Sequence, residues 1–239
     1  ILGYFTVWQG PENNVCDSLN IQKRNEVLIG WSKDGFHWNR ENKKPFLPVS
    51  EDFHAWNAGN VQSTAGSPLI VGDSLYFYVS GRYNSKPKHD SNFATGLAML
   101  RRDGFVSMRA GRKEGYIEIK TQIPANGNYL FVNADVKGTL AVEVLDDNGQ
   151  PMEGFTKKDC ISMKKSDKTK QMISWKKHPD LTSLIGKTVR LRFYLKQADI
   201  YTFWISAWQT GESGGYTGGG GPGLSDKGID TPIDKLKNN

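Results

Sequence analysis

The sequence predicts an all-β chain, in which a partial β-propeller of about two blades is followed by a β-sandwich. One observation is an internal repeat within the first 110 residues. Another is the composition, with 26 glycines in 239 residues and 11% aromatic side chains, which favours sheets joined by tight turns. The third is a later series of segments in which apolar and polar positions alternate. We therefore expect C-terminal propeller blades at 1–110, a sandwich at 111–207 and a glycine-rich extension at 208–239.

The repeat relates two stretches of β-type sequence. Tyr76–Gly81, a polar loop and Thr95–Phe105 can be laid over Tyr4–Gly10, a polar loop and Asn25–Phe36. The two Asp-Gly-Phe triplets lie 69 residues apart. A repeat of this size, made of β-type segments, is typical of a radial or stacked array of small sheets.

The second copy of the repeat is the complete one. Its expected strands are 60–71 with a kink at Gly66, 75–80, 95–101, and a fourth strand after the Asp103-Gly104 turn. Four short antiparallel strands make one propeller blade. The first copy, with strands at 4–8 and 25–31, lacks the opening strand, so the chain holds about one and three-quarter blades.

The pattern of apolar and polar residues changes after about Gly111. Six segments alternate apolar and polar positions and are separated by turn signals such as Asn148-Gly149 and Ile185-Gly186. Strands at this spacing indicate a β-sandwich. The segments are 116–123, 129–134, 139–146, 172–175, 188–195 and 200–206.

The charge and composition of the chain indicate which classes of binding partner to expect. The net charge is +6, but the lysines that supply much of it lie in turns and one strand, without interleaved aromatic residues. A solvated face is the favoured interpretation, ahead of binding to an anionic polysaccharide and then to nucleic acid. No stretch approaches the roughly 18 apolar residues of a membrane span, and the four histidines form no zinc-like cluster. We expect no nucleic-acid, membrane, metal or cofactor partner. The lysines are Lys157, Lys158, Lys164, Lys165, Lys168, Lys170, Lys176 and Lys177.

Two further features concern the context of the chain. Cys16 and Cys160 match no metal or redox spacing; a disulfide between them and two buried free thiols both stay open. The chain begins inside an expected strand, without a Met start or a signal segment. We expect a mature or truncated part of a longer protein.

One face of the blades collects residues suited to a polyol. Because strand direction alternates within a blade, the start of the first strand, the end of the second and the following loop share a face. Indole stacks on the apolar face of a sugar ring, while amide and guanidinium groups bond its hydroxyls. The alternative is that Trp56 packs between blades and Asn57 forms a turn. The candidate substrate-binding residues are Trp56, Asn57, Asn60, Gln62, Arg82, His89 and Asp90.

A catalytic pair is not evident. Glycoside hydrolysis needs two carboxyl groups roughly 5–10 Å apart. Asp34, Asp73 and Asp103 belong to turns on the opposite face and are expected to be structural. No catalytic residue is therefore assigned. The remaining carboxylates are expected to be solvated, to orient substrate or to lie away from the axis: Glu51, Asp52, Asp90 and Glu26.

At this point the chain resembles a known family. The segment 29–38, with Ser32, Asp34, Gly35 and Trp38, is similar to the S-x-D-G-x-x-W signature of five-bladed β-propeller glycosidases of families 32 and 43. The order of the segments resembles bacterial proteins with a family 32 glycoside hydrolase N-terminal-like domain. The matching segments are 56–63, 95–105, 130–134, 142–146, 159–160, 189–193 and 214–223.

The resemblance implies a place for this chain in such a protein. Residues 1–50 would be most of blade four and 55–110 blade five, while the family's catalytic carboxylates come from the first three blades, which are absent here. The implied protein is a secreted or periplasmic bacterial glycoside hydrolase that cleaves O-glycosyl bonds of a poly- or oligosaccharide. Its partners would be carbohydrate and the missing N-terminal blades.

Two further expectations follow. The alternative function is a non-catalytic carbohydrate-binding protein that uses the sandwich face, for which stacking residues such as Tyr201 or Trp204 must be exposed. An incomplete propeller leaves unpaired edge strands and an apolar flank, so we expect the isolated chain to self-associate, to aggregate, or to depend mainly on its sandwich for stability.

Overall fold

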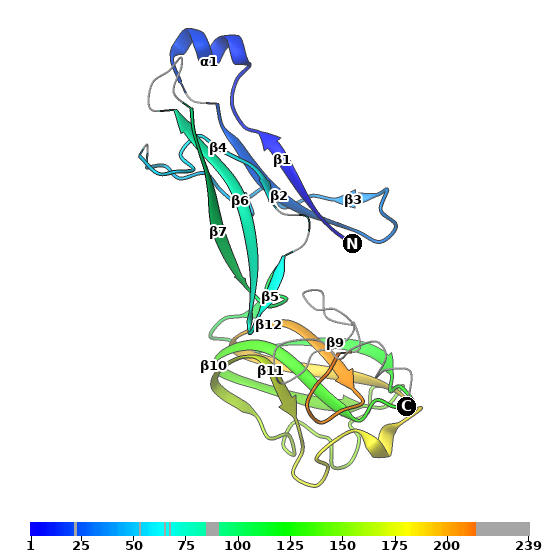
Figure 1. Ribbon diagram of the computed structural model, residues 1–239. Coiled ribbons are helices and arrows are strands. Elements are labelled where there is room, and N and C mark those ends of the chain that lie inside the picture. The colour runs from blue at the N-terminus through cyan, green and yellow to red at the C-terminus, as the bar shows by residue number, and fades with distance from the viewer. Residues whose placement is uncertain (22, 53, 65, 67, 85–90, 214–239) are drawn as a thin grey trace. The chain divides into compact units, whose positions relative to one another are not determined.

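The computed structural model describes residues 1–21, 23–52, 54–64, 66, 68–84 and 91–213. In these residues it contains twelve strands, one α-helix and one 3-10 turn, so the chain is all-β, as the sequence predicts (Figure 1). The chain divides into two compact units. The first is Ile1–Leu69 with Tyr76–Met99, and the second is Ile70–Leu75 with Leu100–Asn239.

The first sheet has seven strands in the order β1-β2-β4-β6-β5, with β3 on β2 and β7 on β6. β1 and β2 are antiparallel, and β2 meets β4 in parallel through one pair, Asn25 with Asn60. The two copies of the repeat therefore share one hydrogen-bonded sheet. The strands are β1 (Leu2–Trp8), β2 (Asn25–Ser32), β3 (Trp38–Asn39), β4 (Asn60–Thr64), β5 (Leu69–Val71), β6 (Ser74–Asn84) and β7 (Ser91–Arg101).

The expected four-strand blade is present only in part. β4 with β5, then β6 and β7 follow the predicted order, with a turn at Gly72-Asp73 between β5 and β6. The strand after Asp103 is β8 (Met108–Ala110), which pairs with β12 of the second sheet and not with β7. Local sequence predicts that segment to be extended, but pairing partners are chosen by long-range contacts. The loop expected at 9–24 also contains a short helix, α1 (Asn13–Leu19), which buries Cys16.

Aromatic side chains hold the first sheet to the loop before β4. The ring of Tyr4 stacks on Phe46 with centroids 5.7 Å apart, and Phe77 meets both rings edge-on. Phe5 meets Trp38 edge-on at 5.1 Å. Such pairs add about 0.5–1.5 kcal/mol each beyond the burial of their area.

The second sheet has five strands in the order β11-β10-β12-β8, with β9 also on β12. β8 and β9 lie end to end along one edge of β12, because they pair with 198–200 and 188–195 respectively. The remaining elements of the unit are β9 (Gly115–Gln122), β10 (Tyr129–Leu145), β11 (Met163–Ile173), η1 (Thr182–Leu184) and β12 (Thr188–Ser206).

Four of the six predicted segments are halves of two long strands. Segments 129–134 and 139–146 both belong to β10, and 188–195 and 200–206 both belong to β12. The register shifts between Val136 and Thr139. There a Cβ on Gly138 would lie 2.3 Å from the carbonyl oxygen of Lys196, and Gln197 has φ 45°. Bulges of this kind bend a strand without ending it, so the turn-like residues mark a bend.

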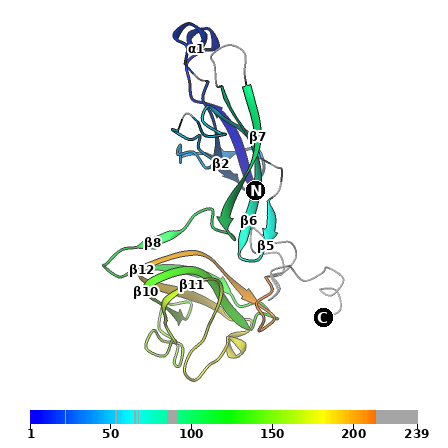
Figure 2. The ribbon, with the colours of Figure 1, turned by 60° about the vertical axis from the view of Figure 1, so that its left-hand side comes forward.

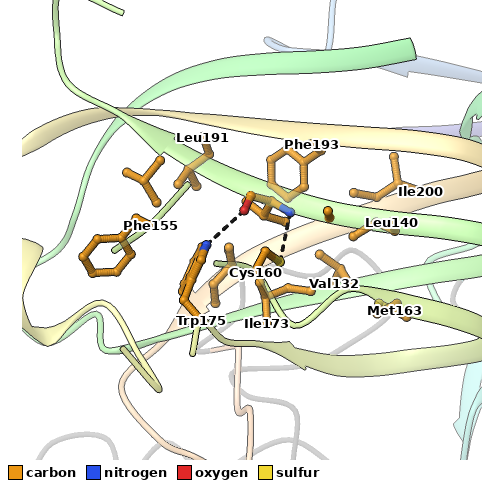
Figure 3. Packing of buried hydrophobic residues seen from close by; sticks show 14 of the residues in the cluster. Val132, Leu140, Phe155, Cys160, Met163, Ile173, Trp175, Leu191, Phe193 and Ile200 are labelled. Carbon is orange, nitrogen blue, oxygen red and sulfur yellow. Dashed lines mark hydrogen bonds between the residues drawn. The ribbon is translucent and has the colours of Figure 1, made fainter. Parts of the chain in front are cut away.

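One curved face of this sheet encloses the main core, and loops cover it (Figure 3). The indole N–H of Trp175 donates to the carbonyl of Val142 at 3.0 Å, and the amide of Val142 donates to the sulfur of Cys160 at 3.2 Å. Phe155 packs edge-on against Trp175. The described strands after residue 107 all belong to this one sheet. The covering layer that a sandwich would take from a second sheet comes here from loop side chains.

Candidate functional site

A row of paired residues crosses one end of the first sheet. Trp8 on β1 pairs with Asn25 on β2, Asn25 pairs with Asn60 on β4, and Asn60 pairs with Arg82 on β6. Directly paired residues on neighbouring strands project to the same face of a sheet. The four residues of this Trp8–Arg82 row therefore lie on the same face of the sheet.

Hydrogen bonds hold the centre of the row. With the amide oxygen of Asn60 turned toward its donors, it accepts from Nδ2 of Asn25 at 2.8 Å and from Nε and Nη2 of Arg82, both at 3.2 Å. Asn25 and Asn60 are buried, whereas the side chain of Arg82 is half-buried and its guanidinium lies 5.9 Å from the Phe93 ring centroid. The guanidinium is thus oriented by a buried acceptor, which limits its conformational freedom.

An open depression adjoins the row at Trp8. Its volume is about 530 Å³ and it is lined by Trp8, Glu12, Asn13 and Asn14. The indole is partly exposed, and its N–H donates to the carbonyl of Pro11 at 2.9 Å. That bond fixes the ring at the edge of the depression. The site therefore combines a positioned aromatic ring with amide and carboxylate groups.

A second polar cluster lies on the opposite side of β2. Glu26 is buried, accepts from the amide of Val49 at 3.2 Å and pairs with Arg24 at 3.0 Å. Arg24 also pairs with Glu51 at 2.9 Å, and these two carboxylates raise the pKa of its guanidinium. Glu26 and Glu51 thus share a guanidinium, an arrangement that holds the loop before β4 to the sheet.

The structure places the predicted site residues in different surroundings. Asn60 and Arg82 belong to the row. Trp56 lies on the other face of β6 and β7, where a Cβ on Gly81 or Gly96 would come within 2.3 or 2.2 Å of its ring. Asn57 donates to the carbonyl of Pro48 at 3.3 Å. Gln62 is exposed on β4, and its backbone carbonyl accepts from the hydroxyl of Thr6.

Some predicted features lie outside the description. His89 and Asp90 are not among the described residues. Within the described ranges no group of three or more His, Cys, Asp or Glu side chains is arranged to hold a metal ion. No helix in that part of the chain has the length and apolarity to cross a membrane.

The turn aspartates make the hydrogen bonds of structural residues. Asp34 accepts from the backbone amides of Phe36 and His37 at 2.9 and 2.8 Å. Its bonds to His37, first to the ring and then to the amide, hold the pKa of Asp34 well below its usual range. Asp73 accepts from the hydroxyl of Thr169, and Asp103 has φ 52°.

The second unit presents a ladder of charges and tyrosines that sequence reasoning missed. Arg192 on β12 pairs in register with Glu118 on β9 and with Glu143 on β10. It donates to Glu118 at 2.7 and 2.9 Å, and this contact, with a second from Arg190, lowers the pKa of Glu118. Tyr194 donates to Glu143 at 2.8 Å. The three carboxylate and guanidinium side chains therefore line up across three strands.

An exposed aromatic ring accompanies this ladder. Tyr116 is 63% exposed, and the guanidinium of Arg192 lies 5.0 Å from its ring centroid. In contrast, Trp204 is buried, stacks on Phe131 and donates to the carbonyl of Gly211 at 3.0 Å. Arg101 covers Tyr201 at 4.9 Å. Of the aromatic side chains in this unit, Tyr116 is thus placed to meet a ligand, whereas Trp204 is a core residue.

Comparison with known proteins adds no relative. No protein family, curated protein or solved structure matches the chain. The function is therefore argued from the site alone.

Proposed function

We propose that this chain is the C-terminal part of a glycoside hydrolase-like protein, in which its first unit, as blades of a five-bladed propeller, lines a site for a poly- or oligosaccharide. The observation that carries the proposal is the Trp8–Arg82 row. It places Trp8 and Arg82 in one row, with the buried amides of Asn25 and Asn60 between them, at the end of the sheet where the sequence predicts the sugar to bind.

The chemistry of the row suits a sugar. A pyranose ring offers a flat C–H face, which stacks on indole, and hydroxyl groups, which need directional donors and acceptors. Trp8 supplies the first and Arg82 the second, while Asn13 and Asn14 line the adjoining depression.

Hydrolysis is assigned to further blades of the parent protein. Glu26 and Glu51, on the opposite side of β2, are bridged by Arg24 and so serve as structural ion-pair partners. Leu69, Val71 and Tyr78 are exposed, and because an apolar sheet surface is usually covered, they favour packing against additional blades. A secreted or periplasmic location fits a polymeric substrate.

The binding test uses the chain 1–239 with a panel of soluble oligosaccharides in isothermal titration calorimetry. We expect binding without release of reducing sugar. Trp8→Ala should weaken binding at least about tenfold, in line with the loss of one stacking contact and its ordered ring. The matched control is Phe36→Ala, because Phe36 is equally aromatic and 87% exposed but lies in the turn after β2. Equal affinity of wild type and Trp8→Ala would remove the row as the binding site.

The proposed parent has its own test, independent of binding. The intact mass and N-terminal residue of the native protein should show a mass several tens of kilodaltons, on the scale of further blades, above the 26.7 kDa of this chain. A native mass of 26.7 kDa would remove the enzymatic part of the proposal and leave the binding part to the calorimetry.

The ladder in the second unit favours one alternative, a non-catalytic carbohydrate-binding protein. Tyr116 offers an exposed ring beside Glu118 and Arg192. The burial of Trp204, one of the stacking residues expected from the sequence, counts against this alternative. In the same calorimetry, Tyr116→Ala would abolish binding if this alternative holds, and Ile161→Ala, at another exposed position of the unit, would not.

A further inference from the structure

The edge strand β7 lacks the usual protection of an exposed edge. In the described part of the chain, β7 pairs only with β6, alongside which it runs in Figures 1 and 2. A free edge presents unpaired N–H and C=O groups, and soluble proteins usually guard it with charged residues or proline. Ten consecutive residues of β7, Ser91–Leu100, include neither.

The other sheet of the same chain shows the usual protection. Its edge strand β11 carries exposed Lys164, Lys165 and Lys168. The edge strand β1 is also uncharged, but the ring of its Tyr4 packs between Phe46 and Phe77. Among the uncharged edges of the first sheet, β1, β5 and β7, the uncharged run of β7 is the longest in the described strands.

One face of β7 carries exposed side chains, all of them uncharged and most of them apolar. Phe93, Leu97 and Met99 are 76%, 45% and 67% exposed, and Thr95 between them is exposed as well. The opposite face turns toward the first unit's interior, where Trp56 lies against Gly96. A strand with an exposed apolar face and a free edge can gain both hydrogen bonds and side-chain contacts from one added strand.

The sequence of β7 is symmetric about Gly96. Small residues stand at equal distances from it, as Ala94 and Ala98, and so do the large residues Phe93 and Met99. If β7 pairs antiparallel with its own copy about Gly96, Phe93 lies opposite Met99 and Thr95 opposite Leu97. Every exposed position then meets an exposed position, and every small position meets a small one.

From these observations we propose that β7 forms an antiparallel pair with β7 of a second copy of this chain, on a two-fold axis through Gly96. Such an interface is isologous, because each copy contributes the same patch. It joins the two first-unit sheets edge to edge and satisfies the free edge of both strands. No charged side chain lies within 93–99, so no like charges meet directly across the axis. The pairing uses the strand edge, and its Phe93 also lies 5.9 Å from the guanidinium of Arg82 in the Trp8–Arg82 row.

The oligomeric state of the whole chain is the first test. Sedimentation equilibrium across a protein concentration series should give twice the chain mass of 26.7 kDa at the upper end. Leu97→Lys should raise the dissociation constant at least about tenfold, because it places a charge in an apolar contact and repeats it across the axis. Ile161→Lys, at an exposed position of the second unit, should leave it unchanged. Circular dichroism confirms that both variants stay folded. A wild-type monomer throughout, or a dimer that Leu97→Lys leaves intact, would overturn the proposal.

Cross-linking tests the register. The double variant Thr95→Cys/Leu97→Cys places cysteines directly opposite each other in the proposed pairing, so mild oxidation should give a covalent dimer. The double variant Phe93→Cys/Thr95→Cys places none opposite another and should stay monomeric on a non-reducing gel. The two native cysteines are buried in both variants. A cross-link in the second variant and none in the first would overturn the two-fold axis at Gly96.

Discussion

The amide of Asn25 on β2 donates to the amide oxygen of Asn60 on β4 at 2.8 Å, across the single parallel pair that joins the two copies of the repeat. Both side chains are buried. Asn60 also receives two bonds from Arg82, so one amide oxygen links three strands. This contact is the polar centre of the Trp8–Arg82 row.

Asn60→Ala should therefore destabilise the first unit. Removing the acceptor leaves the buried amide donor of Asn25 and the half-buried guanidinium of Arg82 without this partner, at a cost of about 1–3 kcal/mol. Urea unfolding followed by circular dichroism measures the loss. The matched control is Gln62→Ala on the same strand, where the side chain is exposed, and a change within about 0.5 kcal/mol is expected. Equal midpoints for the two variants would show that Asn60 does not link the strands.

Gly81→Ala tests the packing role of Trp56. A Cβ at this position would lie 2.3 Å from the indole, so the ring must shift, at a cost of about 1–3 kcal/mol. The fluorescence emission maximum of Trp56 should shift in Gly81→Ala. Its signal is identified by comparison with a Trp56→Phe variant, which lacks this indole. Gly115→Ala, where nothing lies within 4 Å of the added carbon, serves as the control. An unchanged melting temperature for Gly81→Ala would mean that Trp56 does not pack there and is available to a ligand.

Gly138→Ala should disturb the bend shared by β10 and β12. The added carbon would lie 2.3 Å from the backbone oxygen of Lys196, which moves less easily than a side chain, and we expect a loss of about 1–3 kcal/mol in the second unit. Gly111→Ala has open space around it and should be neutral within about 0.5 kcal/mol. Hydrogen exchange of β10 and β12 should rise for Gly138→Ala. If it rises equally in both variants, the bend does not depend on this glycine.

Asp34 should contribute to the decrease in the free energy of unfolding at acid pH. Its folded-state pKa is lowered, chiefly by the bond to His37, so its contribution is present above the unfolded value of about 4. That contribution is lost as the pH falls below about 4 toward the lowered folded value. Urea midpoints between pH 2.5 and 6 should therefore converge for wild type and Asp34→Asn at the acid end and separate above it. Because the group is exposed, the difference should shrink in high salt. A constant difference across this range would contradict the assignment.

Several elements could be predicted because their signals are local. Alternation of apolar residues and the Asp-Gly and Gly-Asp turns located β2, β6 and β9 within a few residues. The open question about Cys16 and Cys160 resolves as two buried free thiols. For Cys160, burial raises the pKa of the thiol. Of the site, Asn60 and Arg82 could be anticipated as polar residues at strand ends.

Partners across the sheet could not be predicted in the same way. Nothing local shows that β2 will meet β4 through one residue pair, so Trp8 and Asn25 were not recognised as members of the row. The residues around Gly138 resemble a turn, yet the chain continues as one strand, because two unpaired residues of β10, 137 and 138, lie opposite the single unpaired Gln197 of β12. The same holds for β8, which leaves the first sheet for β12.

The all-β class, the strand positions and the turn residues follow from the chain's own pattern of side chains, since extended backbone and tight turns depend on neighbours a few residues away. Which strands pair, which aromatic rings are buried and which polar groups meet depend on segments far apart in sequence. Trp56 and Trp204 became packing residues, and Trp8 joined Asn25, Asn60 and Arg82, because hydrogen-bond pairing between distant strands set which faces are covered.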